Sequence, residues 1–135
     1  MTQYADVILS LPLDQPYTYS IPDELEERAA VGSRVLVPLG DRWLTGFVVG
    51  LRKKKPRIPL KLKPVAEVLD ERPVLTRELL AFTRRVSQSS FTAWGEILQA
   101  AVPPSLLPRT RTTISLTPKG LESLEQGTRS DEERQ

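Results

Sequence analysis

The stretch WLTGFVVGL, residues 43–51, is the strongest strand signal in the chain and decides the fold. Its aromatic and β-branched residues favour extended backbone. Gly46 and Gly50 interrupt it, and a glycine inside a strand indicates a bulge, a bend or the close approach of another backbone. Bends of this kind let short strands curl into a small barrel. We therefore expect residues 43–51 to form the fourth strand of a barrel-like sheet.

Four more predicted strands flank this one, each bounded by turn-forming residues. Residues 4–11 alternate between apolar and mixed positions, which is typical of a strand with one buried face. The prolines in PLDQP, residues 12–16, and in PLGD, residues 38–41, favour turns over a continuing ladder. The face of the first strand expected to point inward carries Ala5, Val7, Leu9 and Leu11. The remaining strands are residues 17–21, 34–37 and 65–69.

A change of sequence period then predicts two helices. Thr76 is placed to cap a helix that runs to about residue 88, and Thr92 is placed to cap a second helix over residues 93–101. The side chains expected to face inward are Leu79, Leu80, Phe82 and Val86 in the first helix and Trp94, Ile97, Leu98 and Ala101 in the second. The pattern as a whole indicates a mainly β fold with α: a small antiparallel β-barrel-like, OB-like domain followed by two helices.

The pattern also predicts where this domain ends. We expect it to fill residues 1–105 of the 135-residue chain, and to be monomeric. Residues 106–125 are too few to bury a core alone, so they are expected to be the opening of an incomplete second domain. Residues 126–135 are polar and highly charged, which predicts disorder.

Composition excludes several classes of function. The chain has no cysteine and no histidine, which removes thiolate catalysis, cysteine- or histidine-ligated metal and any Ser/His/Asp triad. No glycine loop is followed by Lys-Ser or Lys-Thr, so ATP hydrolysis is not assigned to these residues. No stretch approaches the roughly 18 apolar residues of a membrane span. We expect no catalytic residue, metal or cofactor on this chain. Carboxylate chemistry, for example by Glu67 and Asp70, is the one enzymatic alternative left open.

Positive charge is concentrated in one predicted loop, although the net charge is only +2. Lysine and arginine in such a loop bind a nucleic-acid backbone by displacing counterions. The alternative is an ordinary solvated surface loop. The residues expected to contact the DNA backbone are Arg52, Lys53, Lys54, Lys55, Arg57 and Lys61.

Two further features near the predicted turns can serve a binding site. Tyr17 and Tyr19 share a strand face, where aromatic rings stack on bases or pack in the core, and we expect at most one of them to reach a ligand. Gly40 lies in a predicted turn, where it permits a positive φ or the approach of a ligand to the backbone.

Five stretches together resemble the N-terminal region of the PriA family (primosomal protein N-prime), the bacterial replication-restart helicases. They occur in the order and spacing of that family: VILSLPLDQPYTYS (7–20), VGSRVLVPLG (31–40), TGFVVGL (45–51), KPVAEVLDERPVL (63–75) and WGEILQAAVPP (94–104). The resemblance implies a cytoplasmic bacterial domain that recognises the 3′ end of the nascent leading strand at stalled or branched forks. It also implies that residues 106–125 begin a winged-helix domain, and that ATP and zinc belong to domains absent from this chain.

The family pocket for the terminal nucleotide, carried across by resemblance, falls on Tyr17, Thr18, Gly40 and Lys63. Thr18 stands where the family has an acidic residue. Its hydroxyl is a neutral and weaker acceptor for a 3′-hydroxyl than a carboxylate. Asp14 lies nearby in sequence as a possible substitute.

The resemblance implies forked DNA as the partner, with single-strand DNA-binding protein and other primosome proteins as further partners, and no membrane. A different class of function stays open beside it, a barrel that docks a helicase core or a single-strand DNA-binding protein through the basic loop. DNA binding that weakens with salt distinguishes the two classes.

Overall fold

The computed structural model describes residues 3–57, 61–103 and 117–119. The strands are β1 (Gln3–Leu9), β2 (Tyr17–Ile21), β3 (Arg34–Leu39), β4 (Arg42–Arg52) and β5 (Glu67–Val68). A short 3-10 helix (Asp23–Leu25) follows β2, and two α-helices follow β5: α1 (Arg77–Ser90) and α2 (Trp94–Ala101). The predicted incomplete domain and tail lie outside the described residues, except for residues 117–119.

The five strands form one antiparallel sheet in the order β2-β1-β4-β3-β5. The chain just before β5 returns to the outer edge of β2. The backbone N–H of Ser20 donates to the carbonyl of Lys63 at 3.1 Å, and the N–H of Val65 donates to the carbonyl of Ser20 at 2.9 Å. These two hydrogen bonds close the sheet on itself. The expected small antiparallel barrel followed by two helices is therefore confirmed.

A β-bulge in β4 produces part of the curvature. The pairing of β1 with β4 shifts between Asp6, opposite Gly50, and Val7, opposite Val48, so Val49 has no partner on β1. An extra residue of this kind bends the strand and increases its twist. The bulge that the glycines in residues 43–51 predict is thus present beside Gly50.

The barrel interior is filled by alternate residues of the strands. Ala5, Val7 and Leu9 of β1 are buried there, as their alternation predicts, and Leu11 packs partly buried against them. The other buried members of this cluster are Tyr19, Ile21, Ala29, Val35, Val37, Val48, Val65 and Val68.

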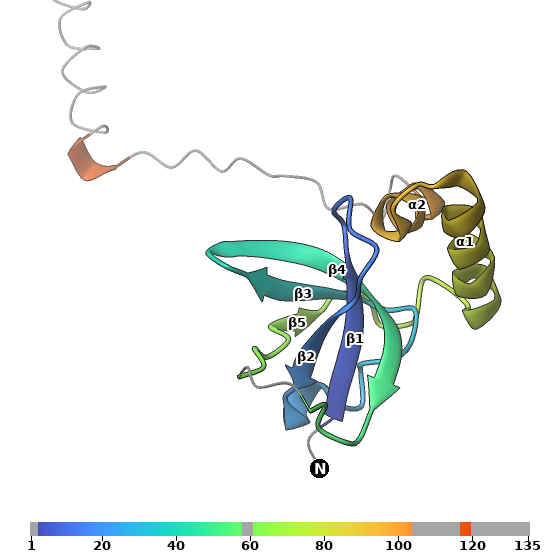
Figure 1. Ribbon diagram of the computed structural model, residues 1–135. Coiled ribbons are helices and arrows are strands. Elements are labelled where there is room, and N and C mark those ends of the chain that lie inside the picture. The colour runs from blue at the N-terminus through green and yellow to red at the C-terminus, as the bar shows by residue number, and fades with distance from the viewer. Residues whose placement is uncertain (1–2, 58–60, 104–116, 120–135) are drawn as a thin grey trace, which may run out of the picture.

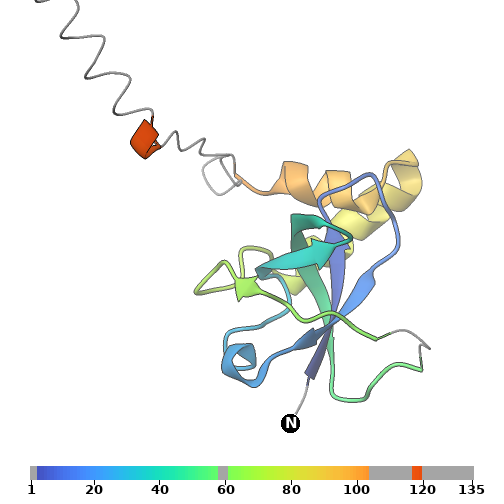
Figure 2. The ribbon, with the colours of Figure 1, turned by 90° about the vertical axis from the view of Figure 1, so that its left-hand side faces the viewer.

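A second core lies outside the barrel, between the sheet and the helices. Figures 1 and 2 show both helices together on one side of the barrel. Ile8 of β1 and Phe47 of β4 point toward them and are buried. The helices and the chain beside them contribute Leu75, Leu80, Leu98 and Val102 to this cluster. β1 is therefore buried on both faces.

The structure corrects the expected inward face of α1. Phe82 is 63% exposed, because it lies about 200° around the helix from the buried Leu80. The buried stripe of α1 is Leu80, Thr83 and Ser87, at a spacing of three and four residues. Thr83 and Ser87 use their hydroxyls locally, donating to the carbonyls of Leu80 and Thr92.

The helix caps divide into one confirmed and one wrong prediction. Thr76 accepts a hydrogen bond from the N–H of Leu79 at 3.1 Å, as expected of an N-cap. Thr92 does not cap α2. The Asp14 carboxylate, brought in by the loop between β1 and β2, accepts from the N–H of Trp94 at 3.0 Å instead. A residue 80 positions away takes the role because the loop folds over the start of α2.

Asp70 and Arg34 form a buried ion pair at the end of β5. Their side chains are 8% and 9% exposed, and Nη2 of Arg34 lies 2.7 Å from Oδ1 of Asp70. Asp70 also accepts from Nε and from the backbone N–H of Arg34. Burial alone acts to raise the pKa of Asp70, but the hydrogen bonds and charge of Arg34 outweigh it and hold the pKa below its ordinary value.

This lowered pKa predicts a loss of stability in acid. The unfolded chain binds a proton at Asp70 more readily than the folded chain does, so stability rises with pH through this range. The contribution is complete above the ordinary carboxyl pKa of 3.8 and is lost as pH falls through the lower folded value. Urea unfolding between about pH 6 and about pH 1.5 measures it, because the loss continues until the pH lies below the folded pKa. Asp70→Asn should flatten this part of the profile, and an unchanged slope would contradict the assignment to Asp70.

Candidate nucleic-acid interface

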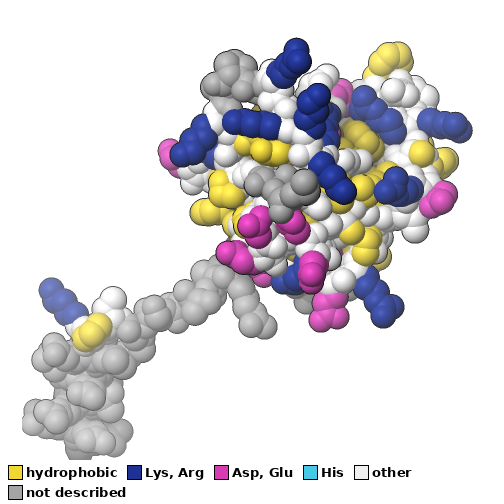
Figure 3. All heavy atoms as spheres, turned by 90° about the horizontal axis from the view of Figure 1, so that it is seen from below, with side chains coloured by type: hydrophobic (Ala, Val, Ile, Leu, Met, Phe, Trp, Pro, Cys, Tyr) yellow, Lys and Arg dark blue, Asp and Glu magenta, His cyan; other side chains and the backbone are white. Residues whose placement is uncertain are grey.

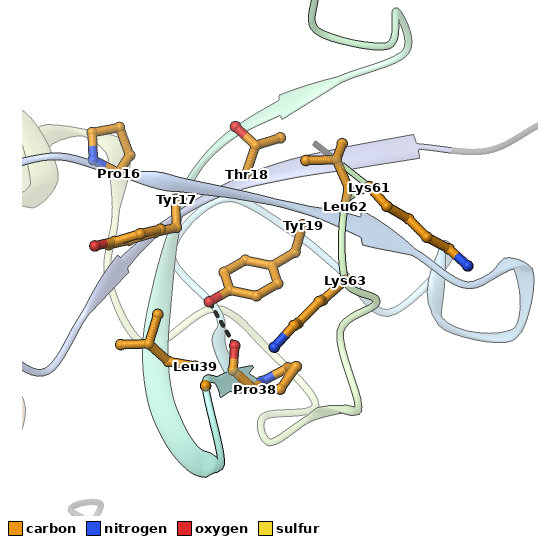
Figure 4. Close-up of a pocket in the computed structure, with 10 residues that line it drawn as sticks. Pro16, Tyr17, Thr18, Tyr19, Pro38, Leu39, Lys61, Leu62 and Lys63 are labelled. Carbon is orange, nitrogen blue, oxygen red and sulfur yellow. Dashed lines mark hydrogen bonds between the residues drawn. The ribbon is translucent and has the colours of Figure 1, made fainter. Parts of the chain in front are cut away.

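A pocket of about 280 Å³ opens on the barrel surface, between the start of β2, the turn from β3 to β4 and the chain before β5. Figure 4 shows it from outside, with β2 along one side and the β3–β4 turn on the other. All four residues of the resemblance-derived site line it, together with Lys61. The lining residues are Pro16, Tyr17, Thr18, Tyr19, Pro38, Leu39, Gly40, Lys61, Leu62 and Lys63.

The two tyrosines of β2 have different surroundings in this pocket. Tyr19 is only 4% exposed, and its hydroxyl donates to the carbonyl of Pro38 at 2.9 Å. Burial, and to a smaller degree the proximity of Tyr17, raises the pKa of Tyr19, so its hydroxyl stays protonated at neutral pH. Tyr17 is 40% exposed and leaves its ring accessible. Of the two rings, Tyr17 is the one placed to stack on a ligand.

Gly40 shapes the rim of the pocket through its backbone. It is the first residue of a two-residue turn between the paired Leu39 and Arg42, and its φ is +59°. A side chain is unfavourable at this φ, whereas glycine adopts it at no steric cost. A Cβ there would meet no atom within 4 Å, so the space over Gly40 is open. The predicted positive φ is confirmed.

Lys63 is fixed in place by the barrel closure. Its carbonyl accepts from the backbone N–H of Ser20, and the N–H of Val65, two residues further along the chain, donates back to the carbonyl of Ser20. In Figure 4 the Lys63 side chain points into the pocket toward Pro38, whereas that of Lys61 is directed away. Both lysines are exposed. The pocket therefore combines an accessible aromatic ring with one inward-pointing positive charge.

Thr18 lines the pocket by its backbone, since its side chain projects from the other face of β2 (Figure 4). There its Oγ1 donates to Oδ1 of Asp6 at 2.9 Å. Asp6 also forms an ion pair with Arg52, whose Nε and Nη2 both lie 2.8 Å from Oδ2 of Asp6. The Thr18 hydroxyl is thus directed at a carboxylate on the opposite face from Tyr17. Asp14, the possible substitute, caps α2 and does not line this pocket.

The remaining basic residues lie exposed on the chain that leads from β4 toward the pocket. Arg52 differs from them because its guanidinium forms an ion pair with the Asp6 carboxylate. Figure 3 shows one face of the molecule, on which most Lys and Arg side chains are spread over the upper part and several acidic ones are grouped below them. The exposed residues of the predicted backbone-binding set are Lys53, Lys54, Lys55, Arg57 and Lys61.

Sequence reasoning missed Arg42. It pairs directly with Leu39 across the β3–β4 turn, and paired residues of antiparallel strands place their side chains on the same face. Leu39 lines the pocket, so Arg42 is an exposed positive charge beside one of its walls, although it is not among the lining residues. The signal was available in principle, because a two-residue turn at Gly40 fixes this register.

The carboxylate pair considered for catalysis is not assembled as an acid–base site. Asp70 is buried against Arg34, whereas Glu67 is exposed. In the described part of the chain, no helix is long and apolar enough to cross a membrane.

Comparison with known proteins gives consistent matches. Residues 6–103 match the family described as the 3′ DNA-binding domain (3′BD) of PriA. A replication restart protein PriA of Bacillus subtilis is 34% identical over 106 residues, covering 76% of this chain and 13% of that protein. The PriA of Treponema pallidum is 29% identical over 119 residues (85% and 18%), and that of Haemophilus influenzae is 28% identical over 127 residues (90% and 17%).

The fold, the pocket and these matches define a DNA-binding domain. More narrowly, the chain belongs to the PriA 3′ DNA-binding domain family. It spans less than a fifth of the length of these three relatives.

Proposed function

We propose that the pocket binds the terminal nucleotide of a DNA strand with a free 3′-hydroxyl, as at the nascent leading strand of a stalled or branched replication fork. The observation that carries the proposal is the meeting of Tyr17, Gly40 and Lys63 in one pocket from three separate parts of the chain. Its volume lies near the lower end of the roughly 300–1,000 Å³ found for small-molecule sites, which suits one nucleotide.

Each of these residues has a chemical role in the proposal. Tyr17 stacks on the terminal base, an interaction that every base supports because every base has a π face. Lys63 contacts the phosphate or sugar of the same nucleotide. Gly40 keeps the rim open for the sugar. No base edge is read, so binding is independent of sequence.

In this proposal the side chain of Thr18 does not accept a hydrogen bond from the 3′-hydroxyl. Its hydroxyl is directed at Asp6, so its contribution to the 3′-hydroxyl comes from its backbone at the pocket wall. Lys53, Lys54, Lys55, Arg57 and Lys61 contact the neighbouring DNA backbone. We further propose that the chain acts in the bacterial cytoplasm as a monomer without a cofactor, and that ATP-driven unwinding and zinc binding belong to parts of the full protein outside this chain.

The test compares two forked DNAs that differ only in carrying a 3′-hydroxyl or a 3′-phosphate on the leading strand. The chain should bind the hydroxyl form more tightly. Lys63→Ala should weaken that binding by about tenfold or more, as expected for loss of a charged hydrogen bond. Arg77→Ala is the control, because it removes an exposed positive charge from a residue that neither lines the pocket nor belongs to the predicted backbone-binding set.

Two results would count against this function. Equal affinity for the two DNAs would rule out recognition of the 3′ end. Binding that does not weaken with salt would favour the alternative of a protein-docking barrel, because phosphate contacts release counterions. Circular dichroism of each variant checks that the fold is retained.

A further inference from the structure

A second hollow, of about 340 Å³, lies on the helical side of the loop between β1 and β2. It is lined by Asp14, Gln15, Arg84, Ser87, Gln88 and Phe91. We propose that it holds the base of a nucleotide that precedes the terminal one, stacked on Phe91. The proposal rests on the proposed 3′-end pocket, since it extends the same strand beyond it.

Phe91 is the residue that points to a ligand. It ends α1 with a φ of +54°, in the left-handed region that glycine or asparagine adopts far more readily. Its side chain is 97% exposed, so packing against the described residues does not explain the ring. The ring gains no stability from burial, and the positive φ of a non-glycine residue costs some. A role in stacking on a base would explain why an aromatic residue stands at this position.

The polar lining of the hollow favours a base over a phosphate. The Asp14 carboxylate, which caps α2, would repel a phosphate placed beside it. Gln15 and Gln88 supply amide donors and acceptors, which match the edges of any base. Arg84 is held with its guanidinium 4.8 Å from the centre of the Trp94 ring. The positive charge of Arg84 is therefore held where it can attract the phosphate of the same nucleotide, which would lie outside the hollow.

The two hollows are lined by consecutive residues of one loop. Asp14 and Gln15 line the second hollow, and the next two residues, Pro16 and Tyr17, line the first. Two residues of chain span at most about 7 Å, so a strand that ends at Tyr17 need cross only this short loop to reach Gln15. The shared loop therefore connects the sites into one path for a single strand.

The experiment measures the affinity of the 135-residue chain for an eight-nucleotide oligothymidine with a free 3′-hydroxyl, and for versions with one abasic nucleotide at the second, third or fourth position from that end. One of these abasic positions should weaken binding to the unchanged protein by about tenfold. In Phe91→Ala the same abasic position should cost almost nothing, because the stacking partner is already gone. Phe82→Ala, which removes another exposed phenylalanine of α1, is the matched control and should behave like the unchanged protein.

Failure of this inference and failure of the proposed function give different results. If Phe91→Ala leaves the cost of every abasic position unchanged, the second site is wrong, whatever the 3′-end result. If a 3′-phosphate on the same oligonucleotide binds as well as the hydroxyl while Phe91 and one abasic position remain coupled, the 3′-end function fails and the base site stands.

Discussion

Replacing Asp70 with alanine should lower the free energy of unfolding by about 3–5 kcal/mol, the usual cost of removing one partner of a buried ion pair. The guanidinium of Arg34 would remain buried without its carboxylate. The backbone N–H of Arg34 would lose its acceptor as well, since it donates to Oδ2 of Asp70 at 3.0 Å. Both losses act on β3, whose other end, at Pro38 and Leu39, lines the pocket.

Urea unfolding at neutral pH measures this effect, with Glu71→Ala as the control because Glu71 is the exposed neighbour of Asp70. The double replacement Arg34→Met with Asp70→Leu should recover much of the loss, because it leaves no buried charge unpaired. A loss below about 1 kcal/mol in Asp70→Ala, the range of exposed pairs, would show that the pair is solvated.

Replacing Gly95 with alanine should destabilise the chain by about 1–3 kcal/mol, the usual range for overpacking. This sign is opposite to that expected inside an exposed helix, where the same change stabilises by about 1 kcal/mol. A Cβ on Gly95 would lie 2.3 Å from the carbonyl oxygen of Leu9 and 2.4 Å from that of Leu11. Both are backbone atoms, so either α2 or the end of β1 must move.

Thermal unfolding followed by circular dichroism tests this effect. Gly50→Ala is the control, because the nearest atom to its new Cβ is an Asp6 carboxylate oxygen at 3.3 Å, about 1 Å farther away than the two carbonyl oxygens at Gly95. A stabilised Gly95→Ala variant would mean that α2 does not pack against β1 at this distance.

Local patterns were sufficient for much of the fold. The alternation of Ala5, Val7 and Leu9 placed the inner face of β1 correctly. It did not reveal that Ile8, on the other face, is also buried, because that depends on helices formed about 70 residues later. Thr76 was identified as a cap because the interaction spans three residues. The cap of α2 was wrong because Asp14 is distant in sequence.

The pocket shows the same division between local and long-range information. The turn glycine was readable from PLGD, since its φ is set by a two-residue turn. The resemblance brought Tyr17, Gly40 and Lys63 together, and they do line one pocket. Spacing alone could not do so, because Lys63 reaches β2 only through the closure at Ser20. The direction of Thr18 depends on Asp6, which lies on the neighbouring strand.

Under the proposed function, the closure at Ser20 couples DNA binding to the stability of the closed barrel. The hydrogen bonds at Ser20 form a seam between β2 and the chain before β5. Tyr17 lies on β2 and Lys63 on the other side of this seam, so a nucleotide held by both side chains bridges the two edges. A ligand that binds only the closed form stabilises that form by an amount that grows with its concentration. Hydrogen exchange at the amides of Ser20 and Val65 should therefore slow as DNA is added, so the seam itself acts as a sensor of occupancy.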